Sequence, residues 1–177
     1  MARIEPNFKM NEFWKLLYIV EWPNKFASFR EHMKNWLIPQ WEMWTTIWHF
    51  MRIEDENNTY WLWIDLDNFE PNYVVDPDKE DVVKKLKEQI EAADTVFVMA
   101  DFDNEGFVIA ETLYKYFSKY KKKFFRTPFT DLDVPSLINA INKRTELNHK
   151  WYTRAWQARA VLDRIIWFGY SPVVRKK

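Results

Sequence analysis

The stretch VFVMADFDNEGF, Val96–Phe107, places three carboxylates directly after a short apolar run. The apolar residues at its start predict a buried strand, and Gly106 near the end of the stretch predicts the start of a helix. Asp101, Asp103 and Glu105 therefore lie where a buried strand ends. Because carboxylates this close repel one another, they favour either a solvated polar turn or a site for a divalent cation.

The sequence around this stretch alternates short strands with helices. Strands are predicted at Leu16–Trp22, Trp41–Phe50, Thr95–Ala100 and Lys121–Phe129, and helices at Lys25–Leu37, Lys79–Ala93, Glu105–Tyr120, Val134–Asn142 (capped by Asp133) and Arg154–Phe168. Residues 51–78 are expected to form a long excursion or hairpin. The alternation predicts an α/β fold with a mostly parallel sheet flanked by helices.

Two predicted strands end in carboxylates. Glu21 ends the first strand, and Asp101 begins the acidic cluster that follows the strand at Thr95–Ala100. Ligands bind at the carboxyl ends of strands in such sheets, so these side chains are expected to meet. Hard oxygen ligands suit Mg²⁺, which takes one or two carboxylates and keeps several waters. The absence of cysteine and the presence of only three histidines disfavour zinc.

Composition limits the remaining possibilities. Lys and Arg (26) balance Asp and Glu (26), so a nucleic-acid partner would need a local basic patch. The absence of cysteine and of an apolar run near ~20 residues predicts a cytoplasmic protein without a membrane partner. The chain has only two glycines, where usage of ~7% would give about a dozen, and eleven tryptophans. This bias leaves open an unusual lineage or a designed chain.

Several motifs in series point to one family. They are IVEWPNK (19–25), NFEPNYVVDPDKEDVVKKLK (68–87), ADFDNEGFVIA (100–110), FTDLDVPSLINAINKRTELN (129–148) and QARAVLDRIIWFGYSPVV (157–174). In this order they resemble the Toprim domain, and specifically the N-terminal part of type IA DNA topoisomerases. The resemblance implies a Toprim domain over residues 1–145, with an excursion around 51–78, and a helical extension over 146–177 toward a further domain.

The resemblance also implies roles for single residues at the acidic edge, by which we mean the carboxyl ends of the strands that precede Glu21 and Asp101. Glu21 matches a glutamate near the scissile phosphate, which transfers a proton or coordinates the metal. Lys25 matches a lysine that stabilises phosphate charge. Asp101, Asp103 and Glu105 match the acidic triad that holds Mg²⁺.

Three further residues match DNA-contacting positions of the family, namely His49, Arg159 and Asp163. Each has a plain structural alternative. His49 fits an ordinary strand-end histidine, and Arg159 with Asp163 fits an i,i+4 ion pair worth a few tenths of a kcal/mol.

The chain departs from the family pattern at several positions. The serine of the first motif is Trp22, the arginine of the acidic motif is Asn104, and its second glutamate is Phe107. Two family glycines are Trp48 and Trp167. Loss of the arginine removes a phosphate-binding cation, and loss of glycine argues against close approach of the backbone to DNA.

Taken together, the resemblance implies a Mg²⁺-binding Toprim domain that supplies the metal half of a site for cleaving and resealing single-stranded DNA. The family's nucleophilic tyrosine would come from the remaining topoisomerase domains or from a second subunit, so the isolated chain is expected to be inactive. Two alternatives remain open. One is a designed or diverged Toprim-fold scaffold without catalysis, and the other is a stand-alone Toprim nuclease or primase-like protein, which needs no tyrosine.

Overall fold

A computed structural model describes residues 15–21, 23–34, 42–45, 50–54, 73–147, 158–159, 161–163 and 165–174. The side chains of some residues within these ranges, including Asn104 and Glu105, lie outside the description. The chain divides into two compact units, Met1–Phe50 with Asp78–Asn148 and Met51–Pro77 with His149–Lys177. The division predicted at residue 145 stays a prediction.

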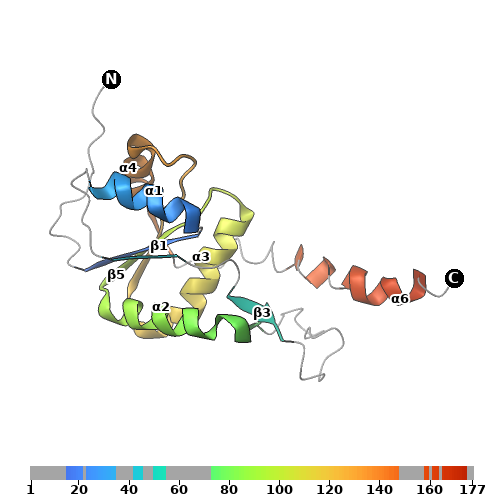
Figure 1. Cartoon of the computed structure of the whole chain (residues 1–177). Helices are drawn as coiled ribbons and strands as arrows, with labels where there is room; N and C mark the ends of the chain where they lie inside the picture. The colour runs from blue at the N-terminus through green and yellow to red at the C-terminus, as the bar shows by residue number, and fades with distance from the viewer. Residues whose placement is uncertain are drawn as a thin grey trace. The chain divides into compact units, whose positions relative to one another are not determined.

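The first unit contains a five-stranded sheet in the order β2-β1-β5-β6-β7 (Figure 1). The strands are β1 (Leu16–Val20), β2 (Glu42–Thr45), β5 (Thr95–Met99), β6 (Lys123–Arg126) and β7 (Thr145–Glu146). The first four pair in parallel, and β7 runs antiparallel to β6. Every residue of β1 and β5 is buried, as expected for central strands covered on both faces. The predicted α/β fold with a mostly parallel sheet is confirmed.

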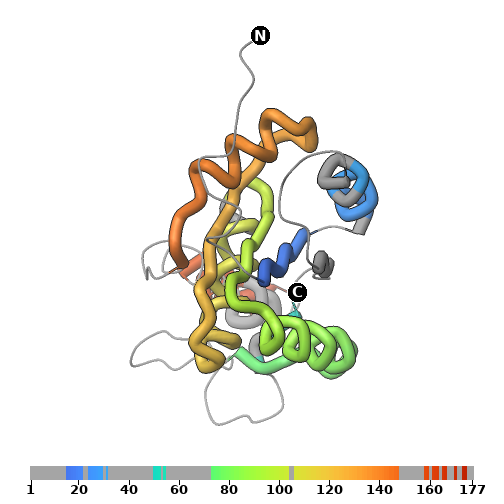
Figure 2. Tube along the Cα trace, turned by 90° about the vertical axis from the view of Figure 1, so that its left-hand side faces the viewer, coloured from blue at the N-terminus to red at the C-terminus, as the bar shows by residue number. Residues whose placement is uncertain are grey.

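Within the described residues, four helices cover the sheet, namely α1 (Pro23–Lys34), α2 (Glu80–Ala92), α3 (Asn104–Phe117) and α4 (Val134–Asn142). Figures 1 and 2 show β1 between α1 on one side and α2 on the other. The contacts of two neighbouring residues of β6 place α3 and α4 on opposite faces of the sheet. Phe124 contacts Tyr114 of α3, whereas Phe125 packs with Phe97 in the core beneath α4. The sheet is therefore covered by α1 and α4 on one face and by α2 and α3 on the other.

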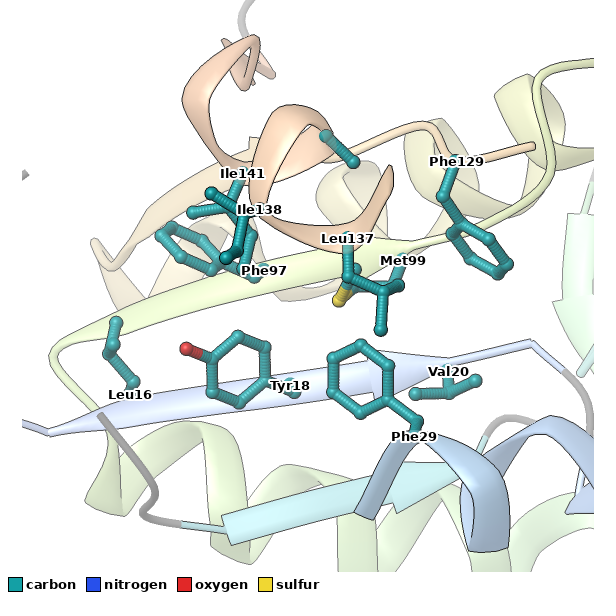
Figure 3. Packing of buried hydrophobic residues seen from close by; sticks show 11 residues of the cluster. Leu16, Tyr18, Val20, Phe29, Phe97, Met99, Phe129, Leu137, Ile138 and Ile141 are labelled. Atoms are coloured by element: carbon teal, nitrogen blue, oxygen red, sulfur yellow. The ribbon is translucent and has the colours of Figure 1, made fainter. Parts of the chain in front are cut away.

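The face under α1 and α4 holds an aromatic and aliphatic core (Figure 3). Tyr18 of β1 lies at its centre, with ring centroids 5.8 Å from Phe29 and 5.5 Å from Phe97. Each such ring removes about 150–250 Å² from water, which makes this layer a main source of stability. Burial raises the pKa of Tyr18, and its hydroxyl has no hydrogen-bond partner among the described residues.

The order of the strands creates a topological switch point between β1 and β5. From β1 the chain passes through α1 to β2 on one side, and from β5 it passes through α3 to β6 on the other. The last pair in their register is Val20 with Met99. In open α/β sheets the crevice outside such a pair of strand ends is the usual ligand site. Glu21 and Asp101 follow these strand ends.

Some predicted elements differ in extent. The strand expected over Trp41–Phe50 is described at Glu42–Thr45, and residues 46–49 lie outside the described ranges. Helix α3 ends at Phe117, and a 3₁₀ turn, η4 (Ser118–Tyr120), follows it. The short strand β7 was not predicted, because two residues carry no period from which a strand can be recognised.

The second unit contains the antiparallel pair β3 (Met51–Ile53) and β4 (Tyr73–Val75), the two ends of the expected hairpin. It also contains a π-helical segment, η5 (Ile165–Tyr170), followed by α6 (Ser171–Val174). An α-helix was predicted through Phe168, and the π geometry corrects this. Pro172 has no N–H to donate to the carbonyl of Phe168, so the α-helical hydrogen-bond series cannot run unbroken from Phe168 into α6. No described helix combines the length and apolarity needed to cross a bilayer.

Candidate active site at the carboxyl edge of the sheet

Glu21 and Asp101 meet at the switch point. The backbone N–H of Glu21 donates to the carbonyl of Met99 at 3.3 Å, which extends the pairing of β1 with β5 by one residue. The N–H of Asp101 donates to Oε2 of Glu21, also at 3.3 Å. The expected meeting of these two strand ends is therefore present in the structure.

Lys25 reaches the same edge from the first turn of α1. This helix begins at Pro23, whose fixed φ favours the first helical position. The Lys25 Nζ lies 2.6 Å from Oδ1 and 2.7 Å from Oδ2 of Asp101, so one ammonium holds both oxygens of the carboxylate. It also lies 5.3 Å from the ring centroid of Phe129. The two paired side chains are 28% and 37% exposed, so solvent screening limits the pair to roughly 1 kcal/mol or less.

Asp103 and Gly106 fix the start of α3 against the end of β5. Asp103 is the N-cap of α3, and its Oδ1 accepts a hydrogen bond from the Gly106 N–H at 2.7 Å. A Cβ at Gly106 would overlap the carbonyl oxygen of Asp101 and lie 3.1 Å from the Cβ of Ala100. Only glycine allows this approach. One oxygen of Asp103 thus serves the helix, and the side chain is exposed.

Arg126 holds the backbone at Asp101 in place, and this role was not predicted from the sequence. It ends β6, is only 3% exposed, and donates from Nη2 to the backbone carbonyl of Asp101 at 3.1 Å. Its guanidinium carbon lies 3.2 Å from the ring centroid of Phe107 in the first turn of α3. The only sequence signal was a single arginine at the end of an apolar strand, next to the strand that carries the acidic cluster.

The surroundings of Glu21 perturb its ionisation. Glu21 is 5% exposed, and its desolvation by burial raises its pKa above the ordinary value of 4.5. The negative charges of Asp101 and Asp103 raise the pKa further. The Asp101 N–H and the Lys25 charge lower it and offset part of the rise. A buried carboxyl with a raised pKa beside an ion pair at a strand edge is typical of a functional site.

The donor set fits a hydrated Mg²⁺ ion. Glu21 and Asp101 offer two carboxylates at one edge of the sheet. Mg²⁺ commonly binds one or two carboxylates and keeps several waters. Among the side chains that the structure describes, no group of three or more His, Cys, Asp or Glu residues forms a metal cage. The Glu105 side chain lies outside that description, so the third member of the predicted triad stays a prediction.

The remaining predicted residues lie either outside the described residues or in the second unit. His49 lies outside the described residues. Arg159 and Asp163 belong to the second unit, where Nε and Oδ2 lie 3.7 Å apart. Their side chains are 75% and 57% exposed, which matches the structural alternative of a surface i,i+4 pair. Their predicted contact with DNA stays a prediction.

Comparisons with known proteins agree with this architecture. Residues 16–132 match the Toprim domain family. The chain is 31% identical over 166 residues to the prokaryotic-type DNA topoisomerase 1 of Acanthamoeba polyphaga mimivirus, and this match covers 92% of the chain and 18% of the relative. It is 36% identical over 110 residues to DNA topoisomerase 1 of Escherichia coli (strain K12), covering 62% of the chain and 13% of the relative.

A solved structure extends the likeness to three dimensions. Full-length topoisomerase I from Thermotoga maritima superposes with a TM-score of 0.75 at 27% sequence identity, over 89% of this chain and 26% of that chain. The protein therefore belongs to the Toprim domain family. Within that family it is homologous to the N-terminal region of type IA DNA topoisomerase 1, of which it spans a minor part.

Proposed function

We propose that this chain is the Mg²⁺-binding Toprim part of a type IA DNA topoisomerase and supplies the metal half of a site that cleaves and reseals single-stranded DNA. One observation carries the proposal. Glu21 and Lys25 meet Asp101, which lies 80 and 76 residues further along the chain, at the switch point of a Toprim sheet. The match to the Toprim family and the likeness to DNA topoisomerase 1 support a role for these residues in phosphate chemistry.

The chemistry of strand cleavage calls for the groups that meet here. Transfer at a phosphodiester is helped by positive charge near the non-bridging oxygens and by a group that exchanges a proton with the leaving or attacking oxygen. Lys25 would supply the charge. Glu21, with its raised pKa, would hold or accept the proton. A bound Mg²⁺ would polarise the phosphate and position its oxygens.

The rest of the reaction needs partners. The nucleophilic tyrosine would come from other topoisomerase domains or from a second subunit, and the substrate would be a single-stranded DNA segment. His49, Arg159 and Asp163 are proposed to contact that DNA, and the reaction would take place in the cytoplasm. Binding of single-stranded DNA that weakens steeply as salt rises would support this assignment.

Calorimetric titration with Mg²⁺ tests the metal site directly. The parent chain should bind Mg²⁺ saturably, and the double variant Asp101→Asn/Asp103→Asn should lose that binding. Asparagine is also a good N-cap, so the second substitution should leave α3 folded. Asp133→Asn is the matched control, because Asp133 caps α4 through the N–H of Ser136 and lies in a separate turn.

Two other results would select an alternative. Absence of binding at millimolar Mg²⁺ would reject the proposal and favour a non-catalytic Toprim scaffold. The cap formed by Asp103 and the ion pair held by Asp101 are the structural features that such a scaffold would retain. Metal-dependent nicking of DNA by the isolated chain, abolished by Asp101→Asn, would instead favour a stand-alone nuclease.

A further inference from the structure

The carboxylate of Asp101 already has a cation. Lys25 Nζ lies 2.6 Å and 2.7 Å from its two oxygens, so two of the three ammonium donors face one carboxylate. A metal ion that binds Asp101 needs oxygen lone pairs that the ammonium now uses. Lysine and metal therefore compete for the same atoms.

Two cations among the described residues contact Asp101, and they differ in their freedom to move. Arg126 is buried and is held between the Asp101 carbonyl and the ring of Phe107. Lys25 reaches Asp101 on a flexible four-carbon stem, and its side chain is 28% exposed. Of these two, Lys25 is the cation that can leave without opening the core.

We infer that Lys25 occupies the cation position at Asp101 until a divalent ion displaces it, so that metal and lysine exchange at this carboxylate. This inference rests on the proposed Mg²⁺ site and concerns its regulation. Displacement frees the ammonium for a substrate phosphate, and the Phe129 ring, 5.3 Å away, retains it near the edge. Because the coupling is reciprocal, a lysine bound to phosphate leaves Asp101 open to the metal.

Removal of the ammonium tests the exchange. Lys25→Met keeps a long unbranched side chain in a helix but removes the charge, so Mg²⁺ affinity should rise roughly three- to tenfold in calorimetry. Lys87→Met controls for overall charge, because Lys87 is 50% exposed on α2 and pairs with Glu91 at 3.9 Å. That variant should bind Mg²⁺ as the parent does.

A charge-keeping variant and a spectroscopic readout separate exchange from a general effect. Lys25→Arg presents a fork that binds carboxylates with two hydrogen bonds, so its Mg²⁺ affinity should equal or fall below that of the parent. In the parent, the ¹⁵N signal of the Lys25 ammonium should shift over the same Mg²⁺ concentrations at which calorimetry records binding. In Asp101→Asn the signal should not respond to Mg²⁺.

The outcomes separate this inference from the proposed function. Saturable Mg²⁺ binding in the parent with equal or weaker binding in Lys25→Met would overturn the exchange and leave the metal site standing. The same holds for a Lys25 signal that ignores Mg²⁺ while the metal binds. Absence of Mg²⁺ binding in both the parent and Lys25→Met would overturn the metal site and the exchange together.

Discussion

The two ends of helix α3 meet the rest of the molecule in opposite ways. At its N-terminus, Gly106 lies against the backbone of Asp101 with no room for a Cβ. Beyond its C-terminus, Lys121 takes a left-handed conformation, φ 54° and ψ 36°, which usually belongs to glycine. The chain thus has glycine at the end next to the acidic edge and lacks it at the end where the turn would favour it.

The difference lies in the kind of penalty a side chain meets at each end. A left-handed residue with a side chain costs about 1–2 kcal/mol and moves nothing else. A Cβ pressed into a backbone carbonyl must move either the helix or the strand. At the N-terminus that displacement would separate Asp101 from its contacts with Lys25 and Glu21.

The largest expected effect comes from placing a methyl group at the close end. Gly106→Ala would gain roughly 1 kcal/mol of helix propensity but force the turn at Asp101 to shift. Overpacking of this kind costs about 1–3 kcal/mol or more, so we expect a net loss of up to about 2 kcal/mol in urea denaturation. Mg²⁺ affinity should fall as well, because Asp101 moves.

Ser118→Ala, just beyond the other end of the same helix, is the matched control. Ser118 is exposed, and its hydroxyl makes one long hydrogen bond of 3.3 Å to the Lys115 carbonyl. Its replacement should change the free energy of unfolding by less than about 0.5 kcal/mol. Equal stability of Gly106→Ala and Ser118→Ala would show that the close approach carries no structural cost, and the comparison would fail.

A second variant removes the support beneath the acidic edge. Arg126→Met keeps the length of the side chain but takes away the donor to the Asp101 carbonyl and the cation over Phe107. We expect a loss of about 1.5–2 kcal/mol in urea denaturation, because the carbonyl is left without this donor.

Arg126→Lys should recover part of the stability, because it restores a cation but not the planar fork. An Arg126→Met variant as stable as the parent would mean that apolar packing replaces the buried guanidinium fully.

The same two ends show how far sequence reasoning reaches. The apolar strand before Asp101, the helix that begins near Gly106 and the meeting of Glu21 with Asp101 were predicted. The hydrophobic period is visible over short stretches of sequence, and the meeting of strand ends follows from simple topology. The support from Arg126 was not predicted. It depends on which strand lies beside β5, and on a guanidinium that points inward rather than to solvent.

The prediction of roles for single residues from the sequence was limited in a similar way. The pairing of Lys25 with Asp101 joins residues 76 positions apart, and a pattern of residue types does not encode which cation faces which carboxylate. Likewise, the sequence suggested metal binding for Asp103, whereas the structure also gives it a capping bond to Gly106. Short polar side chains after a strand serve both purposes, so residue type alone cannot separate them.

A third variant tests the charge of the acidic edge. Folding raises the pKa of Glu21 above 4.5 through desolvation first and the neighbouring aspartates second. The folded state therefore binds this proton more tightly, and the resulting stability is present below pH 4.5 and is lost as pH rises through the folded pKa. Glu21→Gln removes the ionisation, so it should be more stable than the parent at pH 7, by about 1.4 kcal/mol for each unit of the rise.

The difference should shrink toward zero as the pH falls to 4, where Glu21 becomes neutral in both states. Urea denaturation at a series of pH values measures it. Glu88→Gln, an exposed carboxylate on α2, makes the same change of charge and serves as the control. A gain that stays constant between pH 4 and pH 7 would assign the effect to packing, not to ionisation.

The smallest effect is expected at the distant end of α3, where the chain lacks a glycine. Lys121→Gly relieves the left-handed strain and should raise the free energy of unfolding by about 0.5–1 kcal/mol, since the looser unfolded chain offsets part of the gain. Lys119→Gly, two residues earlier within the 3₁₀ turn, should lower it instead, because it also loses contacts with Tyr116 and Tyr120 at 4.9 Å and 5.5 Å. Opposite signs in thermal denaturation would show that glycine is favoured after Tyr120 for conformation alone, whereas Gly106 is required for contact. Equal destabilisation by both variants would mean that Lys121 contributes more through its side chain than its backbone conformation costs.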